Sequence, residues 1–132
     1  MFKGVDHVVV AVRDIEAAVS RYETIYGMSV TTRAEEAAAS MKMAFFRFAD
    51  TYTVLVSSSD GTGRIAAWIN ERGESVWIVA MKVDDITATV TELRDKGVSL
   101  IGDPGPGVPA KGRRVFIDAA ETGGYLMQLI ER

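Results

Sequence analysis

The sequence repeats itself, and this internal duplication restricts the possible folds more than any other feature. The stretch Asp6–Val19 returns as Trp77–Val90, about seventy residues later. The matched positions are Val12 with Val83, Asp14 with Asp85, Ile15 with Ile86, Ala17 with Ala88 and Val19 with Val90. Two copies of a strand–turn–helix–turn–strand unit predict a fold that was built by duplication.

The chain has 132 residues, so each copy spans about 65 residues and is too small to bury a sufficient core alone. The two halves are therefore expected to share a core or a sheet. We predict a first module over residues 1–60, a linker helix over 61–73 and a second module over 74–132.

In the first copy, one helix is expected among several strands. A β-branched run favours a buried strand over 2–12. Asp14 is a typical N-cap for a helix over 15–26, which Gly27 would end. The stretch 33–40 stays open, because its alanines suit a helix whereas its length suits a loop or a strand edge. Further strands are predicted at 28–32, 41–48 and 51–57.

The second copy follows the same order. A strand over 76–83 precedes a helix over 85–96, and a short amphipathic helix over 65–71 connects the copies. All three prolines lie in the Gly-rich stretch 102–112, which no regular element can occupy. Further strands are predicted at 98–101, 114–118 and 125–130. The whole chain reads β-α-β-β-β twice.

Composition excludes several classes of protein. The formal charge of −3 gives no electrostatic reason to expect nucleic-acid binding. Without cysteine there is no disulfide, thiolate nucleophile or Cys-ligated metal site. No apolar run approaches the ~20 residues of a membrane span, and the N-terminus lacks a secretory apolar region. We expect a cytoplasmic protein that binds a small molecule.

Several local phrases resemble the vicinal-oxygen-chelate superfamily of glyoxalases, bleomycin-resistance proteins and extradiol dioxygenases. Within that superfamily they look most like methylmalonyl-CoA epimerases. The phrases that carry the resemblance are Asp6-His7-Val8, Asn70-Glu71-Arg72-Gly73-Glu74, Val83-Asp84-Asp85-Ile86, the stretch 110–117 and the stretch 122–129. The resemblance implies an α+β fold in which two βαβββ modules form a glyoxalase-like open barrel. It also implies a homodimer with the site inside the curl of the sheet.

Family members with a metal commonly take one ligand from the first and one from the last strand of each module. Carried over one at a time, these positions fall on His7, Val54, Ile78 and Gln128. Two of them are aliphatic, and an imidazole with a neutral amide leaves a divalent cation short of the usual three or four protein ligands. The resemblance therefore implies a degenerate metal site, and we expect no cofactor.

A metal-dependent epimerase or lyase would need replacement ligands, for which Glu74 and Glu131 are the candidates. The glutamate base that the epimerases carry before their third strand also lacks a counterpart, because Ala37 and Ala38 fall at that position. The two-base scheme of the epimerases is therefore not carried over to this chain.

His7 and Gln128 are the candidate catalytic residues. A neutral imidazole can act as acid or base near neutral pH, and the amide of Gln128 can donate a hydrogen bond. The alternative is that His7 is a core histidine bonded to a neighbour and that Gln128 is a buried amide with its own partners. Val54 and Ile78 would line an apolar substrate cavity or simply belong to the core.

Lys111, Arg113 and Arg114 follow the Pro/Gly loop, where they would hold a phosphate or carboxylate of the substrate or stay solvated. The sequence favours two functions almost equally. The first is an enzyme that catalyses a proton-transfer, isomerase or lyase-type step on a ligand such as an acyl thioester or a hydrophobic metabolite. The second is a non-catalytic binding protein of the bleomycin-resistance kind.

Overall fold

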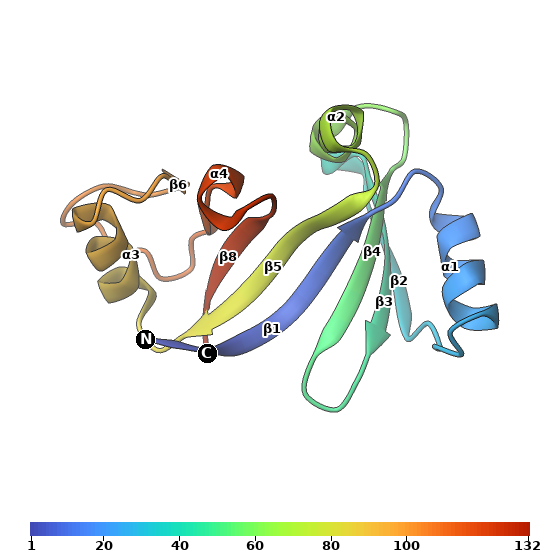
Figure 1. The fold of residues 1–132 in the computed structure, drawn as a ribbon, viewed down its shortest axis with the longest axis horizontal. Coiled ribbons are helices and arrows are strands. Elements are labelled where there is room, and N and C mark those ends of the chain that lie inside the picture. Colours follow the sequence, from blue (N-terminus) through green and yellow to red (C-terminus); the bar gives the residue numbers. More distant parts are fainter. The chain divides into compact units, whose positions relative to one another are not determined.

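The computed structural model describes all residues 1–132 and divides into two compact units (Figure 1). The N-terminal unit is His7–Trp77, and the C-terminal unit combines Met1–Asp6 with Ile78–Arg132. Strands β1 (Phe2–Ala11) and β5 (Ser75–Val83) therefore contribute residues to both units.

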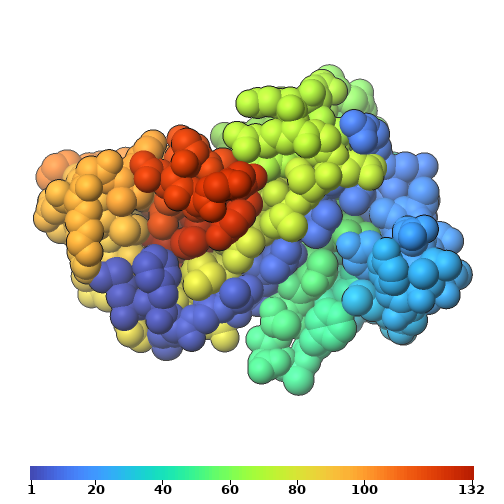
Figure 2. All heavy atoms as spheres, in the orientation of Figure 1, coloured from blue at the N-terminus to red at the C-terminus, as the bar shows by residue number.

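The N-terminal unit contains a four-stranded sheet in the order β2-β3-β4-β1. Strand β1 is parallel to β4, and the other neighbours are antiparallel. The turn between β3 and β4 projects from the surface of this unit (Figure 2). The remaining elements of the unit are α1 (Ile15–Thr24), β2 (Thr32–Glu36), β3 (Met41–Arg47), β4 (Tyr52–Ser58) and α2 (Gly63–Arg72).

Helix α1 begins at the expected cap and covers one face of this sheet. The Asp14 side chain accepts a hydrogen bond from the Ala17 amide at 3.1 Å, which satisfies one free donor of the first turn. The apolar side of α1 then packs on the strands, as its helical spacing predicts. The buried residues of this core are Val12, Ile15, Val19, Ala44, Phe46 and Leu55.

Side chains alternate along a strand, so the other residues of β1, β3 and β4 point away from α1. We call this surface the His7 face. It consists of His7, Val9 and Ala11 in β1, Met43, Phe45 and Arg47 in β3, and Tyr52, Val54 and Val56 in β4.

The C-terminal unit repeats the arrangement with the strand order β5-β8-β7-β6. Strand β5 is parallel to β8, and the remaining pairs are antiparallel. Asp85 caps α3 by accepting a hydrogen bond from the Ala88 amide at 3.0 Å, as its repeat partner does for α1. The other elements are α3 (Ile86–Asp95), β6 (Leu100–Ile101), β7 (Val115–Ile117), α4 (Ala119–Thr122) and β8 (Leu126–Glu131).

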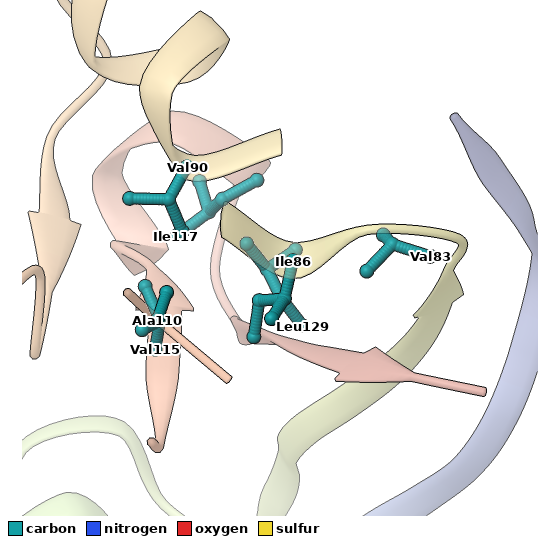
Figure 3. Close-up of a cluster of buried hydrophobic side chains, with 7 residues drawn as sticks. All are labelled: Val83, Ile86, Val90, Ala110, Val115, Ile117 and Leu129. Atoms are coloured by element: carbon teal, nitrogen blue, oxygen red, sulfur yellow. The ribbon is translucent and has the colours of Figure 1, made fainter. Parts of the chain in front are cut away.

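Helix α3 packs on one face of the C-terminal sheet. Figure 3 shows side chains from α3, β7 and β8 converging there. The buried residues of this core are Val83, Ile86, Val90, Ala110, Val115, Ile117 and Leu129. The alternate strand residues point away from α3. We call that surface the Gln128 face, and it consists of Ile78, Ala80, Lys82, Arg114, Phe116, Leu126, Gln128 and Ile130.

The Pro/Gly loop after β6 is held to α3 by an ion pair. Arg94 donates to both carboxylate oxygens of Asp103, at 2.8 and 2.5 Å. These hydrogen bonds, together with one from the Gly105 amide, lower the pKa of Asp103 to about 2. The loop therefore has a defined anchor although it contains no helix or strand.

One predicted strand was misplaced, and one short helix was not predicted. The strand predicted at 28–32 lies instead at β2, because its register is set by pairing with β3, where Thr32 faces Phe45. The open stretch 33–40 forms most of that strand and then a single 3-10 turn over Ala37–Ala39. Helix α4 was not expected, because four residues capped by Asp118 are too few to show helical periodicity.

No helix of the chain has the length and apolar character needed to cross a membrane.

Candidate functional site

His7 is the only histidine of the chain, and it belongs to an aromatic group on the His7 face that is centred on Tyr52. It is 9% exposed. Its ring is stacked on Tyr52, with centroids 4.4 Å apart and planes 12° from parallel. The two residues are register partners in the parallel pair of β1 and β4, which brings their side chains together. The stack holds the imidazole in one orientation.

A cation and a second aromatic ring accompany this stack. The Arg47 guanidinium lies 4.8 Å from the centroid of the Tyr52 ring, and Phe45 lies 6.1 Å from it. Arg47 and Tyr52 are also register partners, in β3 and β4. A cation beside an aromatic face is attracted by the ring quadrupole, so Arg47 helps to hold the ring on which His7 rests.

The rest of the His7 face is apolar. Val9 and Val54, which are register partners, are 7% and 4% exposed. Val54, a predicted cavity residue, is thus buried on the same face as His7. The arrangement places one group that can exchange protons near neutral pH among aliphatic and aromatic side chains.

Gln128 has an analogous place in the C-terminal unit. It is half-buried in β8 between Ala80 of β5 and Phe116 of β7, its register partners. Ile78, which is 7% exposed, lies on the same face. The structure therefore pairs Val54 with His7 in one unit and Ile78 with Gln128 in the other.

The three predicted anion-binding residues have different surroundings. Lys111 forms an ion pair with Glu131 at 3.3 Å, and the other Glu131 carboxylate oxygen accepts from the Ile86 amide. Arg113 is exposed. Arg114 precedes β7, so alternation with buried Val115 directs its side chain to the Gln128 face.

The residues at the family's metal positions do not fit a divalent cation. His7 and Gln128 each offer one donor, whereas Val54 and Ile78 offer none. In neither unit do three or more His, Cys, Asp or Glu side chains form a group that could hold a metal ion. The two replacement candidates have other partners, since Glu74 accepts from the Arg13 amide at 2.8 Å and Glu131 is bound as described above.

Three residues of these faces were not singled out from the sequence. Tyr52 and Arg47 could not be found, because the contacts of Tyr52 with His7 and of Arg47 with Tyr52 depend on the register between strands. Lys82 could have been found, since it lies four residues beyond Ile78 and strand alternation places both on one face.

Comparisons with known proteins agree with this architecture. Residues 6–116 match the model of the Glyoxalase/Bleomycin resistance protein/Dioxygenase superfamily. The ethylmalonyl-CoA/methylmalonyl-CoA epimerase of Cereibacter sphaeroides is 25% identical over 131 residues, covering 98% of each chain. A probable lactoylglutathione lyase of Vibrio cholerae is 26% identical over 126 residues, covering 95% of this chain and 88% of the relative. The crystal structure of methylmalonyl-CoA epimerase from Mycobacterium tuberculosis has a TM-score of 0.76 and 28% identity, covering 97% of this chain and 87% of that one.

Proposed function

Because the chain belongs to the glyoxalase/bleomycin resistance protein/dioxygenase superfamily, we propose that it is an enzyme that moves a proton next to a carbonyl group, with His7 as acid and base. The observation that carries this proposal is the burial of His7 on an apolar face, where its ring is fixed by Tyr52 at 4.4 Å. General acid–base catalysis needs such a group in a defined orientation.

The proposed step conserves all atoms. One imidazole nitrogen takes the proton from the carbon beside the carbonyl, and the electron pair left behind forms an enolate. The imidazolium then returns the proton to a neighbouring atom, which isomerises the substrate, or to the opposite face of the same carbon after the enolate has turned, which epimerises it. Because the donor set does not fit a divalent cation, this step uses only groups of the protein.

Within the C-terminal unit, Gln128 is proposed as a hydrogen-bond donor to the bound ligand. Its half-buried amide sits among apolar neighbours, where a hydrogen bond to a ligand competes least with water. Replacing it with Leu should weaken thioester binding in a calorimetric titration without unfolding the chain, since its neighbours on the face are apolar.

An acyl thioester is the proposed substrate class. The relatives include an epimerase of ethylmalonyl-CoA and methylmalonyl-CoA and a probable lactoylglutathione lyase. The names of these relatives point to thioesters, in which the carbon beside the carbonyl is more acidic than in an ordinary ester. The aliphatic lining that Val54 offers beside His7 suits the acyl part.

Deuterium exchange tests the proposal directly. Methylmalonyl-CoA, ethylmalonyl-CoA and lactoylglutathione are each incubated with the full chain in deuterated water, and the incorporated deuterium is measured by mass spectrometry. The wild type should exchange the proton beside the carbonyl of at least one thioester. His7→Gln should reduce the exchange rate at least about 100-fold.

The control is Lys42→Gln, which changes an exposed side chain of the same unit outside the His7 face. It should exchange at the wild-type rate, and circular dichroism should show all variants folded. Exchange that persists unchanged in a folded His7→Gln variant would overturn the role of His7.

One observation favours the second candidate function, a non-catalytic binding protein. Val54 and Ile78 replace donors by aliphatic side chains, and the stack of His7 on Tyr52 would by itself suit a structural histidine. Such a protein would bind a thioester in a calorimetric titration and return it chemically unchanged. Any deuterated product would exclude this alternative.

A further inference from the structure

The Gln128 face carries two cations without a carboxylate partner. Most basic side chains of the C-terminal unit form ion pairs; Lys3, Arg94, Lys96, Lys111 and Arg132 each lie within 4.0 Å of a carboxylate. Lys82, Arg113 and Arg114 are the exceptions, and two of these three, Lys82 and Arg114, belong to the Gln128 face. Lys82 is half-buried.

The strand register places these two cations around one residue. Lys82 of β5 faces Ile130 of β8. On the other side of β8, Val115 faces Leu129, so Arg114 comes beside Ile130 as well. Adjacent strands are about 4.8 Å apart, so the Cα atoms of Lys82 and Arg114 are roughly 10 Å apart. Both side chains are long enough to reach a common ligand above Ile130.

Burial settles the direction of both side chains. Their chain neighbours Val83 and Val115 are fully buried in the core beneath α3. Successive side chains of a strand point to opposite faces, so Lys82 and Arg114 point away from α3. Gln128 lies one step along the same face, two residues before Ile130.

The backbone of Arg114 is also held in place. A side chain at position 102 would collide with the Arg114 carbonyl oxygen, and Gly102 has a φ of +82° that other residues rarely adopt. The close approach of this glycine packs the loop against the strand that leads into β7. Arg114 is therefore presented by a fixed backbone even though its side chain is exposed.

We infer that Lys82 and Arg114, together with the Gln128 amide, form a binding site for an oxyanion, a carboxylate or a phosphate, that belongs to the bound ligand. A guanidinium binds two oxygens of such a group in parallel, and an ammonium adds a point charge. A half-buried lysine without a counter-ion is electrostatically unfavourable, and a bound anion offsets that cost. Ile78, Phe116 and Ile130 provide apolar surface for the remainder of the ligand.

Asp118, the carboxylate that follows β7, has partners of its own. Asp118, two residues after Phe116, accepts from the Ala120 amide as the cap of α4 and from the Ser99 hydroxyl. This anion site rests on the proposed function in one respect only, namely that the bound ligand is the substrate. The anion would then be a second carboxylate on the acyl group or a phosphate of the thiol carrier.

Titration of the 15N-labelled full chain distinguishes these sources. Malonate and inorganic phosphate are added separately at constant ionic strength, and amide shifts are followed by NMR. We expect saturable shifts at Lys82 and Gln128 and at the Arg114 side-chain N–H. Saturation by malonate alone would identify a carboxylate, saturation by phosphate alone a phosphate, and saturation by both a site for either oxyanion.

Substitutions then test the two cations. Lys82→Met and Arg114→Gln should each weaken binding at least 10-fold, and Arg114→Lys should recover part of it. Arg113→Gln and Lys96→Gln are matched controls and should bind within about twofold of the wild type. Shifts that do not saturate, or equal affinity in all variants, would overturn the inference.

The same samples separate this inference from the proposed function. A wild type that binds the anion but exchanges no proton would refute only the enzymatic proposal. A wild type that exchanges protons with KM unchanged in Lys82→Met and Arg114→Gln would refute only the anion site.

Discussion

The two units attach their helices to their sheets in the same way but differ in the faces turned away from those helices. Asp14 caps α1 as Asp85 caps α3, and each helix buries one apolar cluster. The His7 face presents a stacked imidazole, whereas the Gln128 face presents an amide and two unpaired cations. The duplicated scaffold has thus been kept, while the faces turned away from the helices differ in their polar side chains.

The largest expected effect tests whether the two cores are equivalent. Leu55 and Leu129 occupy matching places in β4 and β8 and are 0% and 2% exposed. Replacing either by Ala removes buried methyl groups and leaves a cavity, so each variant should lose about 3 kcal/mol of unfolding free energy. Urea denaturation measures the loss. A change below about 1 kcal/mol in only one variant would show that the two cores are not equivalent.

The caps should have a smaller effect. Asp14→Ala and Asp85→Ala each leave a donor of the first helical turn without its side-chain partner, so each should lower the unfolding free energy by about 1 kcal/mol. Hydrogen exchange of the amides at Ala17 and Ala88 reports the two helices separately. Asp→Asn at the same positions is the control, because asparagine also caps helices. Faster exchange in both helices from one substitution would contradict independent caps.

The smallest effect concerns pH. Hydrogen bonds from Thr62 lower the pKa of Asp60 in the N-terminal unit, and hydrogen bonds from Arg94 lower that of Asp103 to about 2 in the C-terminal unit. A depressed carboxyl pKa contributes stability above the ordinary value of about 3.8, and this contribution is lost as the pH falls through the folded value. The Arg94–Asp103 pair should therefore persist at pH 4 and weaken towards pH 2.

Carbon-detected NMR titration of the carboxyl groups checks this prediction. Asp103→Asn should abolish the acid-dependent loosening of the Pro/Gly loop while leaving the N-terminal unit unchanged. An Asp103 midpoint near its ordinary value would show that the ion pair does not form in solution.

Much of the fold could be read from the sequence. The repeat, the aspartate caps and the helical spacing identified two βαβββ modules, and the α+β class and the superfamily are confirmed. The position of β2 was missed because an exposed edge strand carries no apolar pattern, and its limits come from pairing with β3. The homodimer stays a prediction.

The sequence by itself determined most of the local elements, the lone histidine and the aliphatic side chains at positions 54 and 78. These depend on residue type and on short-range periodicity, which the chain displays directly. Only the tertiary structure decided that His7 stacks on Tyr52, that Lys111 is paired with Glu131, and that Arg114 lies beside Ile130. Contacts of this kind depend on strand register, which is set by the packing of the whole sheet and by no single segment.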